Sequence, residues 1–270
     1  MTALASLLAT PGPRVMGILN VTPDSFSDGG RFRDHEAALA HARAMIAEGA
    51  DIIDIGGEST RPYGGAAAVS ADEEWERIGA LIPPLVALGT PVSVDTMKAE
   101  VARKALAHRI AIINDVWGLQ RDANMAKVVA DHDCGLVIMH NRDKADETID
   151  IMADIEAFFR RSLAIADRAG IARERILLDP GIGFGKTPAQ SIVVLGRLAR
   201  LETFGLPLFV GASRKRFIAS VSPSEPHERL GGSLVAALAA REAGARVIRV
   251  HDVGATVQAL RVAQAIEASR

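Results

Sequence analysis

The chain has 270 residues, 49% hydrophobic and 24% charged, which is typical of a folded globular protein and excludes the disordered and fibrous classes. Its 31 basic and 33 acidic residues give a net charge of −2, and only 4% of residues are aromatic, so nothing indicates a nucleic-acid partner. Cys134 is the single cysteine, which excludes an intrachain disulfide and any multi-cysteine metal site, and its apolar neighbours predict a buried thiol.

Short apolar runs alternate with amphipathic segments along the chain, as strands and helices do around a parallel sheet. The runs are residues 15–21, 51–55, 91–95, 111–115, 136–139, 176–179, 208–211 and 247–250. Eight such runs in about 250 residues predict an α/β fold, a single-domain (β/α)8 TIM barrel over residues 1–270 with its core at 14–268. A doubly wound open sheet is the alternative.

Capping signals predict the helices between these runs. Asp34 is placed to cap a helix that ends at Gly49, and Ser70 with Glu73 forms a capping-box pattern that opens a helix through about Leu88. Further helices are predicted over 149–170, 234–244 and 256–268.

No apolar stretch reaches the roughly 20 residues of a membrane span, and the first residues lack the charged start and apolar segment of a secretory signal. We therefore expect a cytoplasmic protein without a membrane partner.

Polar residues follow every apolar run, where the carboxyl ends of parallel strands gather ligand-binding loops. They are Asn20, Glu58 to Arg61, Asp95, Asn114 with Asp115, His140, Asp179, Ser213 to Lys215, and Arg249 with His251. Each taken alone has an alternative interpretation as a helix cap or a loop contact. Together they predict a binding site, because burying so many polar groups unpaired would cost several kcal/mol.

The residue types point to two kinds of ligand chemistry. Hydrogen-bond donors suited to phosphoryl oxygens are Thr60, Arg61, Ser213, Arg249 and His251. Asn20, with Asp24 and Asp28 nearby, offers oxygen atoms to Mg2+. The acceptors Asp95, Asn114 and Asp179, together with the charged donor Lys215, suit a flat heterocycle with amine donors and a carbonyl acceptor.

Other common site patterns fail. The segment at 181–187, GIGFGKT, has Pro180 where a P-loop needs glycine, and it lacks the third glycine of a dinucleotide fingerprint. The seven histidines include no HExxH, and neither Ser59 nor Ser213 lies in a G-x-S-x-G elbow. The basic run at 214–216 has the alternative interpretation of a solvated charge cluster.

Several long motifs in order resemble the dihydropteroate synthase family over nearly the whole chain. They are GILNVTPDSFSDGG at 17–30, DIGGESTRP at 54–62, SVDT at 93–96, IND at 113–115, LLDPGIGFGKT at 177–187, GASRKRFI at 211–218 and RVHDV at 249–253. The resemblance implies a (β/α)8 barrel that joins 4-aminobenzoate to 6-hydroxymethyl-7,8-dihydropterin diphosphate with Mg2+ present and releases diphosphate.

The resemblance also implies roles for individual residues. The pterin is expected to contact Asp95, Asn114, Met139, Asp179, Lys215 and Arg249, of which Asp95, Asp179, Lys215 and Arg249 act in catalysis. Diphosphate is expected at Asn20, Thr60, Arg249 and His251, with Asn20 facing the metal. The aminobenzoate side is expected to comprise Thr60, Arg61, Pro62, Phe184 and Ser213.

Within this resemblance we expect a dissociative, Mg2+-assisted reaction in which diphosphate leaves before the amine attacks, so that no protein nucleophile is needed. The resemblance further implies a homodimer through the carboxyl-terminal helices and competition between sulfonamides and 4-aminobenzoate. Two departures from the family pattern are a loop at 63–68 that is about two residues longer and Trp117 where a small residue is common. Rival hypotheses are a non-catalytic pterin-binding homologue and a methyltetrahydrofolate:corrinoid methyltransferase on a similar barrel.

Overall fold

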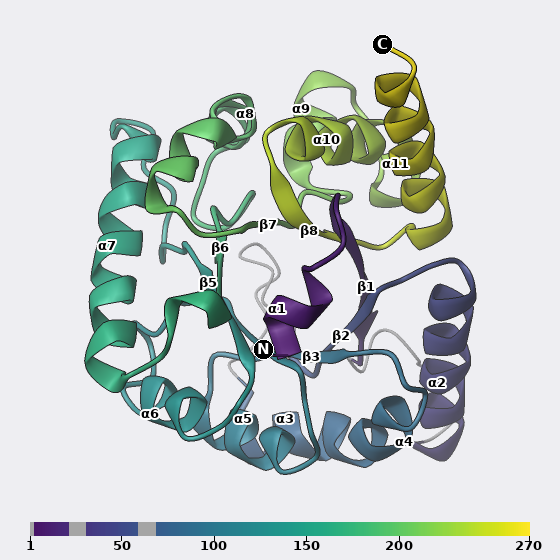
Figure 1. Ribbon diagram of the computed structural model, residues 1–270, viewed down its shortest axis with the longest axis vertical. Helices are drawn as coiled ribbons and strands as arrows, with labels where there is room; N and C mark the ends of the chain where they lie inside the picture. The colour runs from purple at the N-terminus through teal and green to yellow at the C-terminus, as the bar shows by residue number, and fades with distance from the viewer. Residues whose placement is uncertain (1–2, 22–30, 59–68) are drawn as a thin grey trace.

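Eight parallel strands close into a barrel in sequence order, with β1 beside both β2 and β8 (Figure 1). The computed structural model describes residues 3–21, 31–58 and 69–270. The strands are β1 (Arg14–Asn20), β2 (Ile52–Gly56), β3 (Val92–Asp95), β4 (Ile112–Asp115), β5 (Gly135–Met139), β6 (Ile176–Asp179), β7 (Leu208–Val210) and β8 (Ala245–Val250). The predicted (β/α)8 barrel is confirmed, and the open sheet is excluded.

One short helix at the start of the chain lies over an end of the barrel, and the other helices surround the barrel as an outer ring (Figure 1). The helices are α1 (Ala3–Leu7), α2 (Arg31–Ala47), α3 (Ala71–Ile78), α4 (Ile82–Val86), α5 (Ala99–Leu106), α6 (Met125–Ala130), α7 (Ile151–Ala169), α8 (Pro188–Gly196), α9 (Arg216–Val221), α10 (Leu230–Glu242) and α11 (Val253–Ala268). Among these helices, none combines the length and the apolar character needed to cross a bilayer.

Two of the predicted helices have bounds that differ from the prediction. Helix α2 begins at Arg31, so Asp34 lies inside it. The helix expected from Ser70 to Leu88 is divided, because Pro83 and Pro84 occupy the first turn of a new helix, α4. Ser70 does cap α3 by accepting a hydrogen bond from the Glu73 N–H, but the Glu73 carboxylate bonds to Arg77 at 2.6 Å rather than closing the capping box.

The last two helices begin earlier than expected. Helix α10 starts at Leu230, four residues before the predicted start, and α11 starts at Val253, three residues early. Two glycines in the first turn of α10 lower its helix propensity. Tertiary packing overrides it, since a Cβ on Gly232 would lie 2.4 Å from Ile218 Cγ2, so only glycine permits this close approach.

The alternation of side chains along each strand separates two apolar clusters. Side chains facing outward, such as Ile53, Val94 and Ile248, pack beneath the helices. Side chains facing inward form a smaller cluster that fills one end of the barrel: Met16, Ile52, Ile112, Val137, Leu177, Phe209 and Val247. Leu4 of α1 joins the inner cluster, so α1 closes the amino-terminal end of the barrel.

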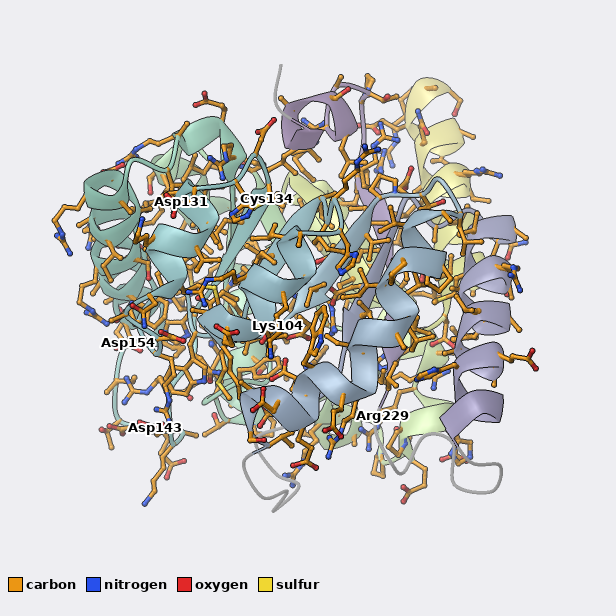
Figure 2. All side chains as sticks on the ribbon, turned by 90° about the horizontal axis from the view of Figure 1, so that it is seen from below. Lys104, Asp131, Cys134, Asp143, Asp154 and Arg229 are labelled. Atoms are coloured by element: carbon orange, nitrogen blue, oxygen red, sulfur yellow. The ribbon has the colours of Figure 1, made fainter. Side chains whose placement is uncertain are left out.

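Figure 2 shows the barrel from the side, with α1 at one end and Asp143 and Arg229 toward the other. Cys134, directly before β5, is 2% exposed, so the predicted burial is confirmed, and burial raises the pKa of its thiol to about 11.

Candidate active site

The inward-facing sides of the strands carry polar side chains at the carboxyl end of the barrel, two residues after the inner apolar cluster. On β2, β4, β6 and β8 the apolar residue of the inner cluster is followed, two positions later, by Asp54, Asn114, Asp179 and Arg249. Period-two alternation therefore points these side chains into the barrel mouth. Asp95 and Met139 end β3 and β5 beside them.

Arg249 is the centre of the polar group. Its Nε donates to Asp54 Oδ2 at 2.6 Å, and a terminal nitrogen donates to Asp95 Oδ2 at 2.9 Å. Asn114 Nδ2 donates to Asp54 Oδ2 at 3.3 Å. Burial by itself lowers the pKa of Arg249, but the carboxylates of Asp54 and Asp95 outweigh it and raise that pKa.

Buried acceptor atoms in this group lack partners. Asp54 Oδ1, Asp95 Oδ1 and Asn114 Oδ1 are buried and accept no hydrogen bond from the described residues. A buried acceptor left unsatisfied costs about 1–3 kcal/mol, so these atoms favour a ligand that presents N–H donors.

Burial also shifts the proton affinity of the site. It raises the pKa of Asp95 to about 7, with Arg249 acting in the opposite direction and Asp54 in the same one. It raises the pKa of Asp179 to about 6, against the Gly181 N–H and the nearby cations Lys186, Lys215 and Arg249. Such shifts are characteristic of groups placed to meet a charged or hydrogen-bonding ligand.

A small cluster of apolar side chains lies beside Asp179. Phe184 clusters with Met139 and Val116, and the half-buried Met97 and Trp117 pack against them. The Lys215 ammonium lies 4.1 Å from the centre of the Phe184 ring. Trp117, which stands where a small residue is common in the family pattern, packs at this rim with the Arg121 guanidinium 4.8 Å from its ring centre.

The loop after β7 is held in an unusual conformation that sets Ser213 and Lys215. Arg214 has a φ of +58°, and its guanidinium donates to both carboxylate oxygens of Asp252 at 3.0 and 2.5 Å. Its N–H donates to Ser233 Oγ at 2.9 Å, and its carbonyl accepts from Arg229 at 3.0 Å. Arg214 is therefore structural rather than part of a solvated charge cluster.

Ser213 and His251 lie together where β7 and β8 end. Ser213 Oγ accepts from the His251 backbone N–H at 3.2 Å, and the His251 Nδ1 is 3.0 Å from the same oxygen. Burial, followed by the charges of Arg249, Arg214 and Lys215, lowers the pKa of His251 to about 3. The imidazole is therefore neutral at physiological pH.

The remaining predicted residues belong to the loops after β1 and β2. Asn20 ends β1 and is half-buried. Thr60, Arg61, Pro62, the 63–68 loop, Asp24 and Asp28 lie outside the described residues. The residues that flank 59–68 are anchored, because Glu58 accepts from the Val69 N–H at 3.3 Å and from Lys98 at 2.6 Å.

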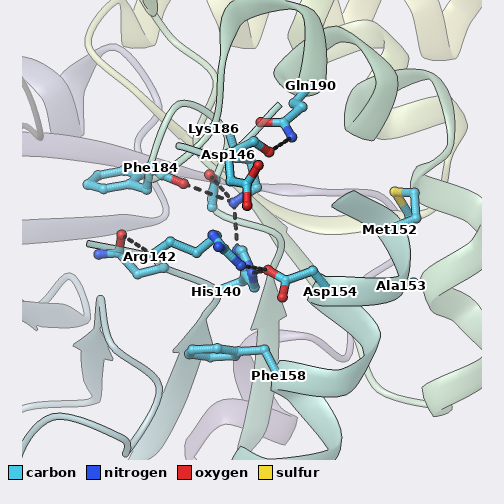
Figure 3. A network of polar contacts seen from close by, with 12 residues as sticks. His140, Arg142, Asp146, Met152, Ala153, Asp154, Phe158, Phe184, Lys186 and Gln190 are labelled. Atoms are coloured by element: carbon cyan, nitrogen blue, oxygen red, sulfur yellow. Dashed lines mark hydrogen bonds and ion pairs between the residues drawn. The ribbon is translucent and has the colours of Figure 1, made fainter. Parts of the chain in front are cut away.

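Two groups of buried polar residues were not anticipated from sequence. The first is Asp54, which lies inside an apolar run. Its position two residues after the inward-facing Ile52 is the signal that would have revealed it. The second group is a chain of contacts that runs from Lys186 through His140 to Asp154, next to Phe184 (Figure 3). His140 was recognised only as a residue at a strand end, and Lys186 only as part of a failed P-loop.

The described residues include no group of three or more His, Cys, Asp or Glu side chains arranged to hold a metal ion. A cation with few protein ligands, such as Mg2+ bound mainly through phosphate oxygens and water, fits the single amide of Asn20.

Comparison with known proteins agrees with this geometry. A family model described as pterin binding enzyme matches residues 16–251. The dihydropteroate synthase of Bacillus subtilis (strain 168) is 46% identical over 240 residues, covering 88% of this chain and 83% of that protein. That of Escherichia coli (strain K12) is 44% identical over 263 residues, covering 94% and 91%.

Solved structures are similar over the same extent. Xanthomonas albilineans dihydropteroate synthase with 4-aminobenzoic acid superposes with a TM-score of 0.91 at 47% identity, covering 95% of this chain and 94% of that one. The same enzyme in complex with 7,8-dihydropteroate gives a TM-score of 0.87 at 45% identity, with the same coverage of each chain.

Proposed function

Since the chain belongs to the dihydropteroate synthase family of pterin-binding enzymes and is a transferase, we propose that it condenses 6-hydroxymethyl-7,8-dihydropterin diphosphate with 4-aminobenzoate to give 7,8-dihydropteroate and diphosphate. The observation that carries this proposal is the set of unsatisfied buried acceptors around Arg249 at the barrel mouth. The amine and ring N–H donors of a pterin are their chemical complement.

In this proposal the pterin lies among residues from several strands. Asp95, Asn114 and Asp179 accept from its N–H groups, and Lys215 donates to its carbonyl. Met139 contributes an apolar surface, and Arg249 stacks on the ring while it holds Asp95 and Asp54 in place. Asp54 is a positioning residue, because its described contacts are to Arg249 and Asn114.

The aminobenzoate is assigned to the side of the mouth formed by Phe184 and Ser213, with Thr60, Arg61 and Pro62 completing it from the loop after β2. Phe184 offers its ring face to the aromatic substrate, and Ser213 offers a hydroxyl to its carboxylate. Inhibition by sulfonamides that compete with 4-aminobenzoate follows from this assignment.

Diphosphate is assigned to Asn20, Thr60, Arg249 and His251. The Arg249 bonds to Asp54 and Asp95 use Nε and one terminal nitrogen, so the second terminal nitrogen, which bonds to none of the described residues, is available to a phosphoryl oxygen. Mg2+, bound through Asn20 and the substrate's own oxygens, would supply charge neutralisation for the departing diphosphate.

The reaction proceeds in two steps in this proposal. The bond from the pterin methylene to the diphosphate oxygen breaks first, and the oxygen keeps the electron pair. The amine nitrogen of 4-aminobenzoate then forms the new C–N bond and loses a proton. Asp95 and Asp179 stabilise the intervening pterin cation, and Arg249 stabilises the charge that develops on diphosphate.

We also propose that the protein is a homodimer through its carboxyl-terminal helices. Large apolar side chains that are exposed on α10 and α11 support this interface: Val235 is 68% exposed, and Val262 and Ile266 are each 53% exposed. The two helices pack against each other, which allows both to contribute to one interface.

The decisive experiment incubates the purified protein with dihydropterin diphosphate, 4-aminobenzoate and Mg2+ and measures dihydropteroate and diphosphate together, with and without chelator. Equal formation of both products that stops on chelation supports the synthase. Pterin binding without product would identify a non-catalytic homologue instead. Methyl transfer from methyltetrahydrofolate to a corrinoid protein would identify the methyltransferase.

A further inference from the structure

A buried lysine lies at the centre of the loop between β6 and α8 and is linked to α7 (Figure 3). Lys186 is 1% exposed. Its Nζ lies 2.9 Å from the Gly181 carbonyl, 3.1 Å from the Phe184 carbonyl and 2.6 Å from His140 Nδ1. On the far side of the ring, His140 Nε2 is 2.9 Å from Asp154 Oδ2, which also accepts from Arg142 at 2.9 Å.

The positions of the hydrogens in this hydrogen-bonded network can be assigned from its acceptors. The bond to His140, with Arg142 adding to it, lowers the pKa of Asp154 to about 2, so its carboxylate only accepts. The hydrogen of His140 is therefore on Nε2, and Nδ1 is an acceptor. The Lys186 amine must then donate to two carbonyls and to Nδ1, which uses the three hydrogens of the ammonium form.

The electrostatic environment agrees with a neutral ring. Burial, followed by the Lys186 charge, lowers the pKa of His140 to about 4, although the Asp154 bond opposes this shift. Burial lowers the pKa of Lys186 to about 7, against the carboxylates of Asp179 and Asp154. The ammonium form therefore predominates below about pH 7, where its three hydrogen bonds offset part of the cost of burying it.

The loop that surrounds Lys186 has little regular structure of its own. Gly181, Gly183 and Gly185 all have positive φ, at +66°, +80° and +53°. Phe184 N–H donates to the Gly181 carbonyl at 3.0 Å, and both of these residues also direct a carbonyl at the ammonium. The turn that bears Phe184 is thus folded around the cation.

We propose that Lys186 is a positioning residue for 4-aminobenzoate: its ammonium, held by His140 and Asp154, fixes the turn that presents the Phe184 ring to the aromatic substrate. The inference deepens the proposed function and rests on it. Lys186 does not itself touch substrate, since its three donors are used inside the protein. It acts through Phe184, whose ring centre lies 4.1 Å from the Lys215 ammonium.

Lys186→Met keeps an unbranched side chain, one atom shorter, and removes the donors. We expect the KM for 4-aminobenzoate to rise at least tenfold, while the KM for the pterin substrate changes less than threefold. Asp154→Asn retains an acceptor for His140 but removes the charge, so it should raise the same KM by a smaller factor. Because Asp154 is only partly buried, this second variant tests the hydrogen-bonded network even if Lys186→Met folds poorly.

Arg175→Met is the matched control. Arg175 is another buried cation that donates to backbone carbonyls, those of Cys134, Val129 and His132, but it precedes β6 at the opposite end of the barrel. We expect it to lower the melting temperature without changing the KM for 4-aminobenzoate more than twofold.

Nitrogen NMR of the His140 ring, assigned with His140→Gln, reads the network independently of catalysis. The wild-type ring should remain the neutral Nε2–H tautomer from pH 5.5 to 8. In Lys186→Met the pKa of the ring should rise above the wild-type value, because Asp154 then faces the ring without the Lys186 charge.

Active wild-type protein together with an unchanged 4-aminobenzoate KM in both Lys186→Met and Asp154→Asn would overturn the inference. A wild-type ring that titrates near pH 6.5 would also overturn it. Wild-type protein that forms no dihydropteroate overturns the proposed function instead, and the NMR result separates the two failures.

Discussion

At the scale of single residues, burial raises the pKa of the carboxyl groups in the site, and neighbouring cations lower it. Asp95 illustrates the balance, because burial raises its pKa while Arg249, 2.9 Å away, favours the ionised form. A small change in charge at the site therefore changes the protonation of Asp95.

Asp95→Asn should lower kcat by roughly 100-fold, the scale seen when one preorganised electrostatic contact to a transition state is removed. The affinity for diphosphate should change far less, because the proposed function assigns Asp95 to the pterin. Steady-state kinetics and calorimetric titration with diphosphate measure the two effects. Asp51→Asn, at the amino-terminal end beside Arg14, is the control and should leave kcat unchanged. Unchanged turnover in Asp95→Asn would refute the role.

The pH dependence of kcat/KM for the pterin substrate should show an acid limb between about pH 6 and 7. The carboxyls of Asp95 and Asp179, with pKa values of about 7 and about 6, become ionised over this range, and the ionised forms stabilise the pterin cation. A profile that is flat or falling from pH 6 to 7 would contradict this expectation.

The free energy of unfolding should fall with rising pH, whereas kcat/KM should rise. In the unfolded chain these carboxyls return to their ordinary pKa of 3.8, so the folded state holds their protons to higher pH. Their stabilising contribution is full below about pH 4 and is lost as the pH rises through 6 to 7. Asp95→Asn removes part of this loss, so its melting temperature should rise relative to wild type at pH 8 more than at pH 4.

At the scale of elements, glycines set the path of the β6–α8 loop. Gly181 has a φ of +66°, and a Cβ there would lie 2.0 Å from the His140 carbonyl oxygen. Gly205, after the 3-10 helix η4 (Leu198–Phe204), has nearly the same φ, +65°, but no atom lies within 4 Å of its Cβ position.

The two glycines form a matched pair for substitution. Gly205→Ala should cost roughly 1 kcal/mol in the free energy of unfolding, the strain of a left-handed residue, and should keep full activity. Gly181→Ala adds the backbone clash, so it should cost clearly more and raise the KM for 4-aminobenzoate. Denaturant unfolding and steady-state kinetics compare them. Equal losses in both variants would show that the close approach at Gly181 has no consequence.

At the scale of the whole molecule, the barrel separates stability from chemistry. One end is filled by the inner apolar cluster and closed by α1, whereas the other end gathers the polar side chains. Among the described residues, large apolar side chains are exposed on the outer helices, such as Val235 on α10 and Val262 on α11.

Val262→Glu on α11 should weaken the proposed homodimer, because it places a charge among exposed apolar side chains. Light scattering after size exclusion should show a shift from dimer to monomer at micromolar concentration. Arg261→Glu, the adjacent charge change on the same helix, serves as a control for charge alone. A wild-type protein that is monomeric, or a Val262→Glu variant that stays dimeric, would contradict the assigned interface.

The sequence by itself determined the barrel and most of its mouth. Eight apolar runs with polar residues at their ends require eight buried strands whose carboxyl ends converge, and the structure has a strand at each run. Asp95, Asn114, Asp179 and Arg249 could be picked out because each ends or nearly ends such a run. The long motifs then identified the family, which spacing and composition could not do.

Tertiary structure alone decided what depends on neighbours distant in the chain. Asp54 becomes part of the site only because β2 and β8 both lie beside β1, which brings Arg249 from 195 residues away to within 2.6 Å. Lys186 becomes a buried cation only because β5 and β6 pair and bring His140 beside its loop. The early start of α10 follows from the packing of Gly232 on Ile218. Local sequence encodes propensity and strand period, whereas these contacts depend on how the barrel closes.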